Sequence, residues 1–256
     1  MPFNSVYLHY NEIIFKVMPT IIHIETSTDI CSVALSHKGE VIFNKENHDG
    51  FTHATHLGLY LESAVRHAEE NNLNIDAVAV SCGPGSYTGL RIGVSTAKGF
   101  CYGKNIPLIS IPTPIVLCEA VLQKEMTGKA DLLCPMIDAR RMEVYAAMYD
   151  LNMNAYKAIS ADIIDENSYA GDFTDHKILF FGNGAEKCKE TITNPNALFL
   201  NDIHPLAKYM VKPAEEKFKK QEFENIAYFE PFYLKEFVAT TAKNKVLGDL
   251  QQNSGK

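Results

Sequence analysis

The hydrophobic pattern begins as a series of strands. Three apolar or alternating runs, residues 20–25, 30–36 and 41–45, follow one another closely, and a polar turn at residues 37–40 joins the last two. Short β-rich runs separated by turn residues are typical of antiparallel strands. The pattern therefore predicts a three-stranded meander near the start of the chain.

The pattern then changes to helical spacing over residues 53–70, with Thr52 as the expected N-cap and an Asn-Asn pair as the stop. The apolar side chains that recur at this spacing are Leu57, Leu61, Ala64, Val65 and Ala68. A buried strand at 75–82, a helix at 88–103 and a strand at 106–111 follow. The predicted order of this first part is βββαβαβ.

A second meander begins further along the chain. An apolar strand ends at Ile137, a polar turn covers residues 138–141, and an alternating strand continues to Tyr149. The first meander has the same form, because its opening strand also ends in an acid, Glu25, before a short polar turn. A buried strand at 177–181 then leads into a glycine turn and an expected helix. The repetition predicts a duplicated α/β core, although an acid at a hairpin turn is common by itself.

This organisation divides the chain into two lobes. We expect the first lobe over residues 18–110 and the second over 111–221, with a strand at 228–234, within a segment 222–236, returning to the first. Residues 237–256 are polar and lack periodicity, which predicts a disordered tail. Residues 1–17 are expected to be an upstream extension, with an extra edge strand as the alternative. Glu12 and Lys16 interrupt the apolar run that a secretory signal would need.

Composition narrows the class of protein. The 256 residues carry 24 Lys plus Arg against 31 Asp plus Glu, a net charge of −7, which argues against a strongly basic nucleic-acid-binding protein. A hydrophobic content of 46% argues against disorder as the main state. The six cysteines are widely spaced without a CxxC pair, so we expect free thiols and a cytoplasmic protein. No apolar run approaches the ~20 residues that span a bilayer, so no membrane segment is predicted.

The most distinctive motif is the glycine-rich stretch at residues 81–93, between a strand and a helix. Backbone N–H groups at such a helix start can bind an anion. Its glycines fit neither a Walker A loop nor a Rossmann GxGxxG, and Ser86 is not in a GxSxG elbow, because Pro84 and Thr88 stand where glycines would be. An anion site and a tight structural turn remain equal alternatives.

Two further groups of residues are candidates for chemistry. Glu25 and Asp138 could flank a magnesium nucleotide between two lobes, with hairpin-turn carboxylates as the simpler interpretation. His48, His53 and His56 lie close in sequence, but HExxH and HxxxH are both missing, so no metal site is predicted.

The helix at 88–103 carries a face of small residues. Gly89, Gly93 and Ala97 recur every four residues, and an interior glycine costs a helix roughly 1 kcal/mol relative to alanine. Close approach of another backbone would offset this cost, either in the core or at a subunit interface. The helix at 53–70 presents Leu59, Ser63 and Arg66 beside its core positions, a mixed face that suits partial burial by a partner.

The glycine-rich stretch, Gly-Pro-Gly-Ser-Tyr-Thr-Gly-Leu-Arg-Ile-Gly at 83–93, closely resembles the signature of the bacterial TsaB (YeaZ) family. The resemblance extends along most of the chain from Met18. It includes Glu-Thr-Ser at 25–27, Asp-Ala-Arg-Arg-Met-Glu-Val-Tyr at 138–145, Gly-Asn-Gly-Ala at 182–185 and Pro-Phe-Tyr-Leu at 231–234.

The resemblance implies an actin-like, Hsp70-like ATPase (ASKHA) fold with two α/β lobes. It implies a role in making N6-threonylcarbamoyladenosine (t6A) at position 37 of tRNAs that read ANN codons. The chain would be a non-catalytic partner of the TsaD transferase in a heterodimer, with the TsaE ATPase joining and a TsaC-type enzyme supplying threonylcarbamoyl-adenylate. A homodimer is an alternative for the free protein, and tRNA contact would come mainly through the partners.

The departures from the family's pattern bear on catalysis. Thr113 and Leu117 stand near the positions where TsaD has its HxxxH metal pair, and the usual first acid is Asp rather than Glu25. No catalytic residue, metal or required cofactor is therefore predicted, although ATP or ADP could bind within the complex. An actin-like ATPase or phosphotransferase is the alternative function, and a metallopeptidase is disfavoured. The candidate anion or nucleotide contacts are Glu25, Thr26, Ser27, Gly83, Gly85, Ser86, Asp138, Gly182 and Gly184. The candidate partner interface, on the two helices of the first lobe, is Leu59, Ser63, Arg66, Gly89, Gly93 and Ala97.

Overall fold

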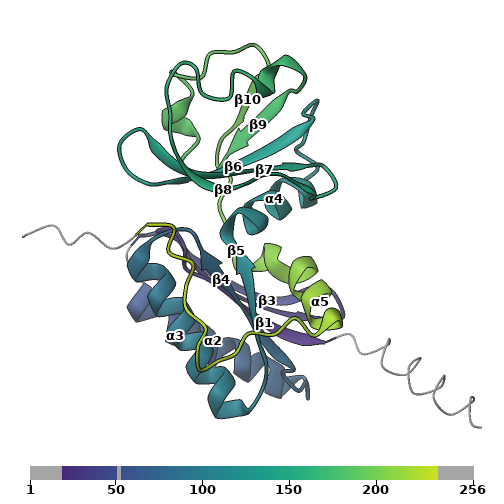
Figure 1. The fold of residues 1–256 in the computed structure, drawn as a ribbon. Helices are drawn as coiled ribbons and strands as arrows, with labels where there is room; N and C mark the ends of the chain where they lie inside the picture. Colours follow the sequence, from purple (N-terminus) through teal and green to yellow (C-terminus); the bar gives the residue numbers. More distant parts are fainter. Residues whose placement is uncertain (1–18, 51–52, 236–256) are drawn as a thin grey trace, which may run out of the picture.

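The computed structural model describes residues 19–50 and 53–235, which form two α/β lobes, one above the other in Figure 1. The predicted extension at 1–17, the N-cap Thr52 and the tail at 237–256 lie outside the described residues. Within the described part of the chain, no helix is long and apolar enough to cross a membrane.

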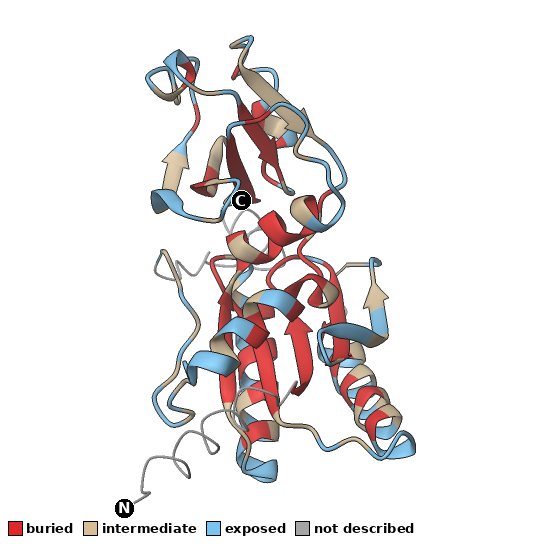
Figure 2. Cartoon of the chain, turned by 90° about the vertical axis from the view of Figure 1, so that its right-hand side faces the viewer, coloured by how far each residue is buried: buried red, intermediate tan, exposed pale blue. Residues whose placement is uncertain are grey.

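The first lobe contains a five-stranded sheet in the order β3-β2-β1-β4-β5. Its strands are β1 (Thr20–Glu25), β2 (Cys31–His37), β3 (Glu40–Asn47), β4 (Ala77–Gly83) and β5 (Leu108–Pro112). The central strand β1 pairs antiparallel with β2 and parallel with β4. Burial is continuous along β1 and β4 (Figure 2), as expected for strands covered on both faces. The predicted meander and the following β-α-β units are confirmed.

The second lobe repeats this sheet. Its strands are β6 (Leu132–Asp138), β7 (Glu143–Asp150), β8 (Ala155–Ile163), β9 (Ile178–Phe181) and β10 (Ala197–Leu200). They lie in the order β10-β9-β6-β7-β8, with β6 antiparallel to β7 and parallel to β9. Because β6 corresponds to β1 in every pairing, the two sheets have the same topology. The predicted duplicated α/β core with two lobes is confirmed.

The helices are distributed unequally between the lobes. Helices α2 (His53–Glu70) and α3 (Tyr87–Lys104) cover one face of the first sheet, and α4 (Thr113–Gln123) lies between the lobes against β4, β5 and β6 (Figure 1). The prediction of a helix after Gly184 is wrong, because the structure has only a single 3₁₀ turn there, η2 (Glu186–Cys188). A second 3₁₀ turn, η1 (Asp172–Thr174), lies between β8 and β9.

The chain returns to the first lobe earlier than the sequence predicts. After β10, the turn η3 (Ala207–Met210) and helix α5 (Val211–Lys220) pack against β1, and α5 also contacts β5. The expected boundary at residue 221 is therefore wrong: α5 completes the first lobe by covering the sheet face opposite α2 and α3 (Figure 1).

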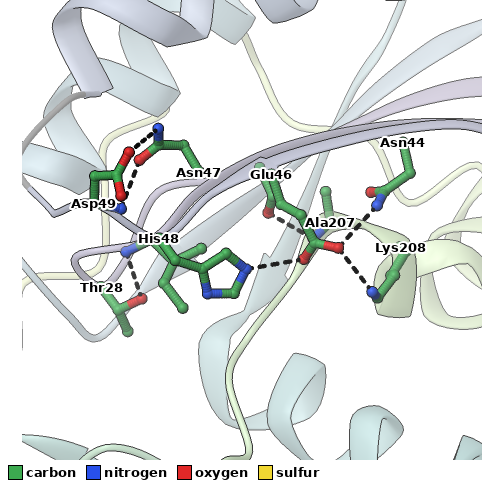
Figure 3. Close-up of polar contacts among 10 residues, drawn as sticks. Thr28, Asn44, Glu46, Asn47, His48, Asp49, Ala207 and Lys208 are labelled. Atoms are coloured by element: carbon green, nitrogen blue, oxygen red, sulfur yellow. Dashed lines mark hydrogen bonds and ion pairs between the residues drawn. The ribbon is translucent and has the colours of Figure 1, made fainter.

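Polar contacts hold η3 in this place. Lys208 forms an ion pair of 3.0 Å with Glu46 at the end of β3, and Asn44 and His48 approach the same carboxylate (Figure 3). The backbone N–H of Ala207 donates to Ser32 Oγ at 2.9 Å. These bonds fix the returning chain to the first sheet.

Residues 222–235, which we call the C-terminal strap, run from α5 back across the first lobe (Figure 1). Backbone contacts that fix the strap include the N–H of Glu224 to Leu108 O at 2.8 Å, Lys98 Nζ to the carbonyl of Phe229 at 2.7 Å, and the N–H of Phe232 to Cys82 O at 2.7 Å. Ser110 and Glu143 bind the side chains of Glu224 and Lys235. The strand predicted at 228–234 is wrong: in the described part of the strap, the one β-bridge is that of Glu224 with Leu108. The strap is held by scattered bonds rather than by a ladder.

Candidate functional site

The first part of the candidate site is the turn that follows β1. Glu25, Thr26, Ser27 and Thr28 are all buried. Glu25 Oε1 accepts a hydrogen bond from the backbone N–H of Ser27 at 2.5 Å, whereas, within the part of the chain that the structure describes, Glu25 Oε2 and the Ser27 hydroxyl have no hydrogen-bond partner. Burial raises the pKa of Glu25 to about 7, although the bond from the Ser27 N–H acts in the opposite direction. With no cation bound, the carboxyl group is therefore partly protonated near neutral pH.

The glycine-rich loop packs directly on this turn. The backbone N–H of Ser86 donates to Ser27 O at 2.6 Å, and the Ser86 hydroxyl caps α3 by accepting from the N–H of Gly89 at 3.3 Å. A Cβ on Gly85 would collide with Ser27 O and lie 2.9 Å from Ser27 Cβ. Of the two alternatives that the sequence leaves open, the geometry supports the structural turn, because the N–H and hydroxyl groups of Ser86 bond within the chain and Gly85 lies directly against Ser27.

The face of small residues on α3 is also part of this packing. The Thr26 hydroxyl donates to Gly89 O at 2.8 Å, and a Cβ on Gly89 or Gly93 would collide with Thr26. Ala97 is fully buried in the core under α2 and α3. The prediction that Gly89, Gly93 and Ala97 form a partner interface is therefore wrong, because the two glycines pack on the turn after β1 of the same chain and Ala97 is buried in its core.

The second part of the site lies at the end of β6, where Asp138 is exposed. Its carboxylate forms an ion pair with Lys187, and Lys187 Nζ also donates to the carbonyl of Glu143 at 2.7 Å. The side-chain oxygen of Asn183 accepts from the N–H of Asp138 at 3.0 Å. Gly182 (φ +99°) packs on Met136 O, and a Cβ on Gly184 would lie 2.8 Å from Ile137 C, so these two glycines support the hairpin.

The two acids lie on different lobes, at the ends of β1 and β6. Among the described residues, no hydrogen bond or ion pair joins Glu25 to Asp138: Glu25 is enclosed in the first lobe, and Lys187 neutralises Asp138 in the second. The residues present thus fit a magnesium nucleotide poorly, and no chemical step is assigned to one.

The structure also places the residues considered for metal binding. The Thr113 hydroxyl bonds to Ser81 Oγ at 2.8 Å, and Leu117 packs in the core between the lobes. Among residues 19–50 and 53–235, no three His, Cys, Asp or Glu side chains are grouped to hold a metal ion.

Part of the predicted interface remains exposed on α2. Leu59 is 60% exposed, Arg66 pairs with Glu62 at 2.8 Å, and Ser63 bonds both the carbonyl of Leu59 and Lys45 Nζ. Their contact with a partner stays a prediction.

Sequence reasoning missed the exposed face of α3. The residues on it are Arg91, Ser95, Gly99, Tyr102 and Gly103, of which Tyr102 is 82% exposed. A Cβ on Gly99 or Gly103 would meet no atom within 4 Å. Ser95, Gly99 and Gly103 also recur every four residues. This second series of small residues, on the opposite side of the helix, is the sequence pattern that could have identified the exposed face.

Comparison with known proteins agrees with this geometry. The family model described as TsaD, tRNA N6-adenosine threonylcarbamoyltransferase, matches residues 50–243. The "tRNA threonylcarbamoyladenosine biosynthesis protein TsaB" of Escherichia coli is 27% identical over 86% of this chain and 96% of its own length. That of Haemophilus influenzae is 25% identical over 84% and 93%.

The chain belongs to the TsaD family, in its TsaB (YeaZ) branch. A solved structure of YeaZ from Pseudomonas aeruginosa superposes with a TM-score of 0.72 at 23% identity, covering 85% of this chain and all of that chain. This likeness shows that the TsaB fold is present with both lobes.

Proposed function

We propose that the chain acts in t6A formation at position 37 of tRNAs that read ANN codons, as a non-catalytic subunit in a heterodimer with the TsaD transferase. The names of the curated TsaB relatives and the TsaD family model support the pathway. TsaE is the expected third component, and ATP or ADP is expected, if at all, within the complex.

The packing of the glycine-rich loop on residues 26 and 27 is the observation that carries the non-catalytic role. In that loop, Ser86 directs its N–H to Ser27 O, and Gly85 and Gly89 leave no room between α3 and the turn after β1. Such a loop stabilises the first lobe and keeps α2 and α3 in a fixed arrangement. Rigid helix faces of this kind are suited to binding a partner protein.

The contact surface for TsaD is proposed on the exposed sides of α2 and α3. It comprises Leu59, Ser63 and Arg66 on α2 together with Ser95, Gly99 and Tyr102 on α3. Large exposed apolar side chains such as Leu59 and Tyr102 lie beside small residues there, which lets a partner helix approach closely.

Co-expression with TsaD followed by size-exclusion chromatography tests the heterodimer. We expect the two chains to elute together and Leu59→Glu to abolish co-elution without changing the melting temperature of the isolated protein. The matched control is Ile163→Glu, because Ile163 is 76% exposed but lies on the second lobe. Equal loss with both variants, or co-elution that survives Leu59→Glu, would contradict the proposed surface.

Two assays test the non-catalytic role. Isothermal titration of ATP into the isolated chain should give no binding heat, and the chain without TsaD should transfer no threonylcarbamoyl group to tRNA. Tight magnesium-dependent ATP binding would support the alternative ATPase instead.

A further inference from the structure

The hairpin between β6 and β7 has an unusual backbone. Arg140 and Arg141 at its tip have φ values of +72° and +50°, a conformation that glycine and asparagine adopt far more easily than arginine. The N–H of Glu143 donates to Arg140 O at 3.2 Å and holds the turn closed. Strain of this kind costs stability and is concentrated at functional positions.

The charges around the tip leave the two arginines unpaired. Lys187 binds Asp138 and the carbonyl of Glu143, and Lys235 at the end of the C-terminal strap forms an ion pair with the Glu143 carboxylate. At the hairpin itself, the four cations Arg140, Arg141, Lys187 and Lys235 therefore lie with the two acids Asp138 and Glu143, and further along the strap Arg91 and Glu230 both act on Tyr233. Within the described residues, neither Arg140 nor Arg141, both exposed, forms an ion pair. The tip is a local excess of positive charge on a chain whose net charge is −7.

Aromatic rings lie among these cations. Burial raises the pKa of Tyr145, and the nearby positive charges of Lys235 and Arg140 act against that rise, which places both cations near its hydroxyl. On the strap, the ring of Tyr233 lies 4.6 Å from that of Tyr87 at the start of α3, and Arg91 acts on the same Tyr233 hydroxyl. The strap therefore connects the hairpin tip with the start of α3, and at Tyr233 the positive charge of Arg91 is opposed by the nearby carboxylate of Glu230.

We propose that this band, Arg140 and Arg141 with Lys235 and Tyr233, is a docking surface for the phosphate backbone of a structured RNA. This proposal rests on the proposed function, because that function identifies the RNA as a tRNA. Guanidinium groups bind phosphate oxygens through paired hydrogen bonds, and neighbouring rings provide stacking surfaces for unpaired bases.

The mixture of cations and rings favours RNA over an acidic protein partner. The band spreads over elements of both lobes, as suits an extended backbone rather than one small anion. We expect this band to contribute a small part of the tRNA-binding affinity, with most of the affinity coming from the partner proteins.

The double variant Arg140→Asn/Arg141→Gly separates binding from folding. Asparagine and glycine tolerate positive φ, so the variant should melt at the same temperature as the parent or higher. The control Lys38→Asn/Lys220→Gln removes two exposed cations elsewhere, one of them, Lys38, also at a hairpin tip with positive φ.

The measurement is the affinity of the complex with TsaD for a tRNA transcript at several salt concentrations. The tip variant should bind about tenfold more weakly, and the slope of log K against log salt should fall by about 2, one per lost phosphate contact. The control variant should bind like the parent. Unchanged affinity and slope in the tip variant would overturn the inference.

Co-elution with TsaD, measured on the same samples, separates this inference from the proposed function. If the parent chain fails to co-elute with TsaD, the proposed function fails, and the tip is tested with the full chain alone at low salt. If the tip variant loses co-elution rather than RNA affinity, the band binds an acidic protein surface and the RNA proposal is wrong.

Discussion

Replacing Glu25 by glutamine should make the protein more stable at alkaline pH and remove one source of pH dependence. The carboxyl group is fully buried, and burial raises its pKa from 4.5 to about 7. The folded state therefore holds a proton that the unfolded chain releases above pH 4.5. Stability is lost as the pH rises from 4.5 to 7, because the unfolded chain gains free energy by releasing a proton that the folded state retains.

The magnitude follows from the size of the shift. A difference of about 2.5 units at about 1.4 kcal/mol per unit corresponds to about 3 kcal/mol at pH 8, as an order of magnitude. Glutamine has nearly the same shape and no charge to bury. The free energy of unfolding of Glu25→Gln minus that of the parent should therefore increase by about 3 kcal/mol between pH 4.5 and 8.

Urea unfolding followed by circular dichroism at several pH values measures this difference. Glu40→Gln is the matched control, because Glu40 is exposed and its difference from the parent should stay flat with pH. If Glu25→Gln also gives a flat difference, the carboxyl group does not bind its proton in the folded state, and the reasoning from burial fails.

Two further predictions follow from buried contacts. Gly93→Ala should destabilise the isolated protein by about 1–3 kcal/mol, because the new methyl group meets Thr26. Gly99→Ala, on the open side of α3, should instead stabilise it by up to about 1 kcal/mol. Thermal melts that rank the two variants in the opposite order would contradict the core packing. Burial also lowers the pKa of His23 to about 3, so the stability that its neutral form contributes above pH 6.5 should be lost as the pH falls towards 3, and His23→Gln should show less of this acid loss in the same urea series.

The elements of the first lobe could be predicted because its helices have one buried apolar face and its strands are short apolar runs bounded by turn residues. Helix α2 shows five apolar positions at regular spacing, and β1 is apolar between turn residues. Helix α4 was missed for a physical reason: it lies between the lobes with eight of its eleven residues buried, so it lacks the polar face that reveals a helix by periodicity.

The site was predictable only in part. The sequence identified the glycine-rich loop and the acids that end β1 and β6, which are local features. It could not show that Gly89 and Gly93 pack on Thr26, because that neighbour lies more than sixty residues earlier and small residues look the same in a core and at an interface. Nor could it show the positive φ values of Arg140 and Arg141, since arginine is not a residue that signals such a turn.

The return of α5 to the first lobe has a consequence for the order in which the protein can fold during synthesis. The second sheet is continuous in sequence from Leu132 to Leu200, whereas the face of the first sheet that includes Ile109 and Ile111 is covered by η3 and α5. A growing chain thus presents an uncovered apolar sheet face until the residues around Ala214 have been made, although that sheet was synthesised first. The lobe that begins the protein is the last to be completed, and a nascent chain stalled within the second lobe would carry an exposed, aggregation-prone surface.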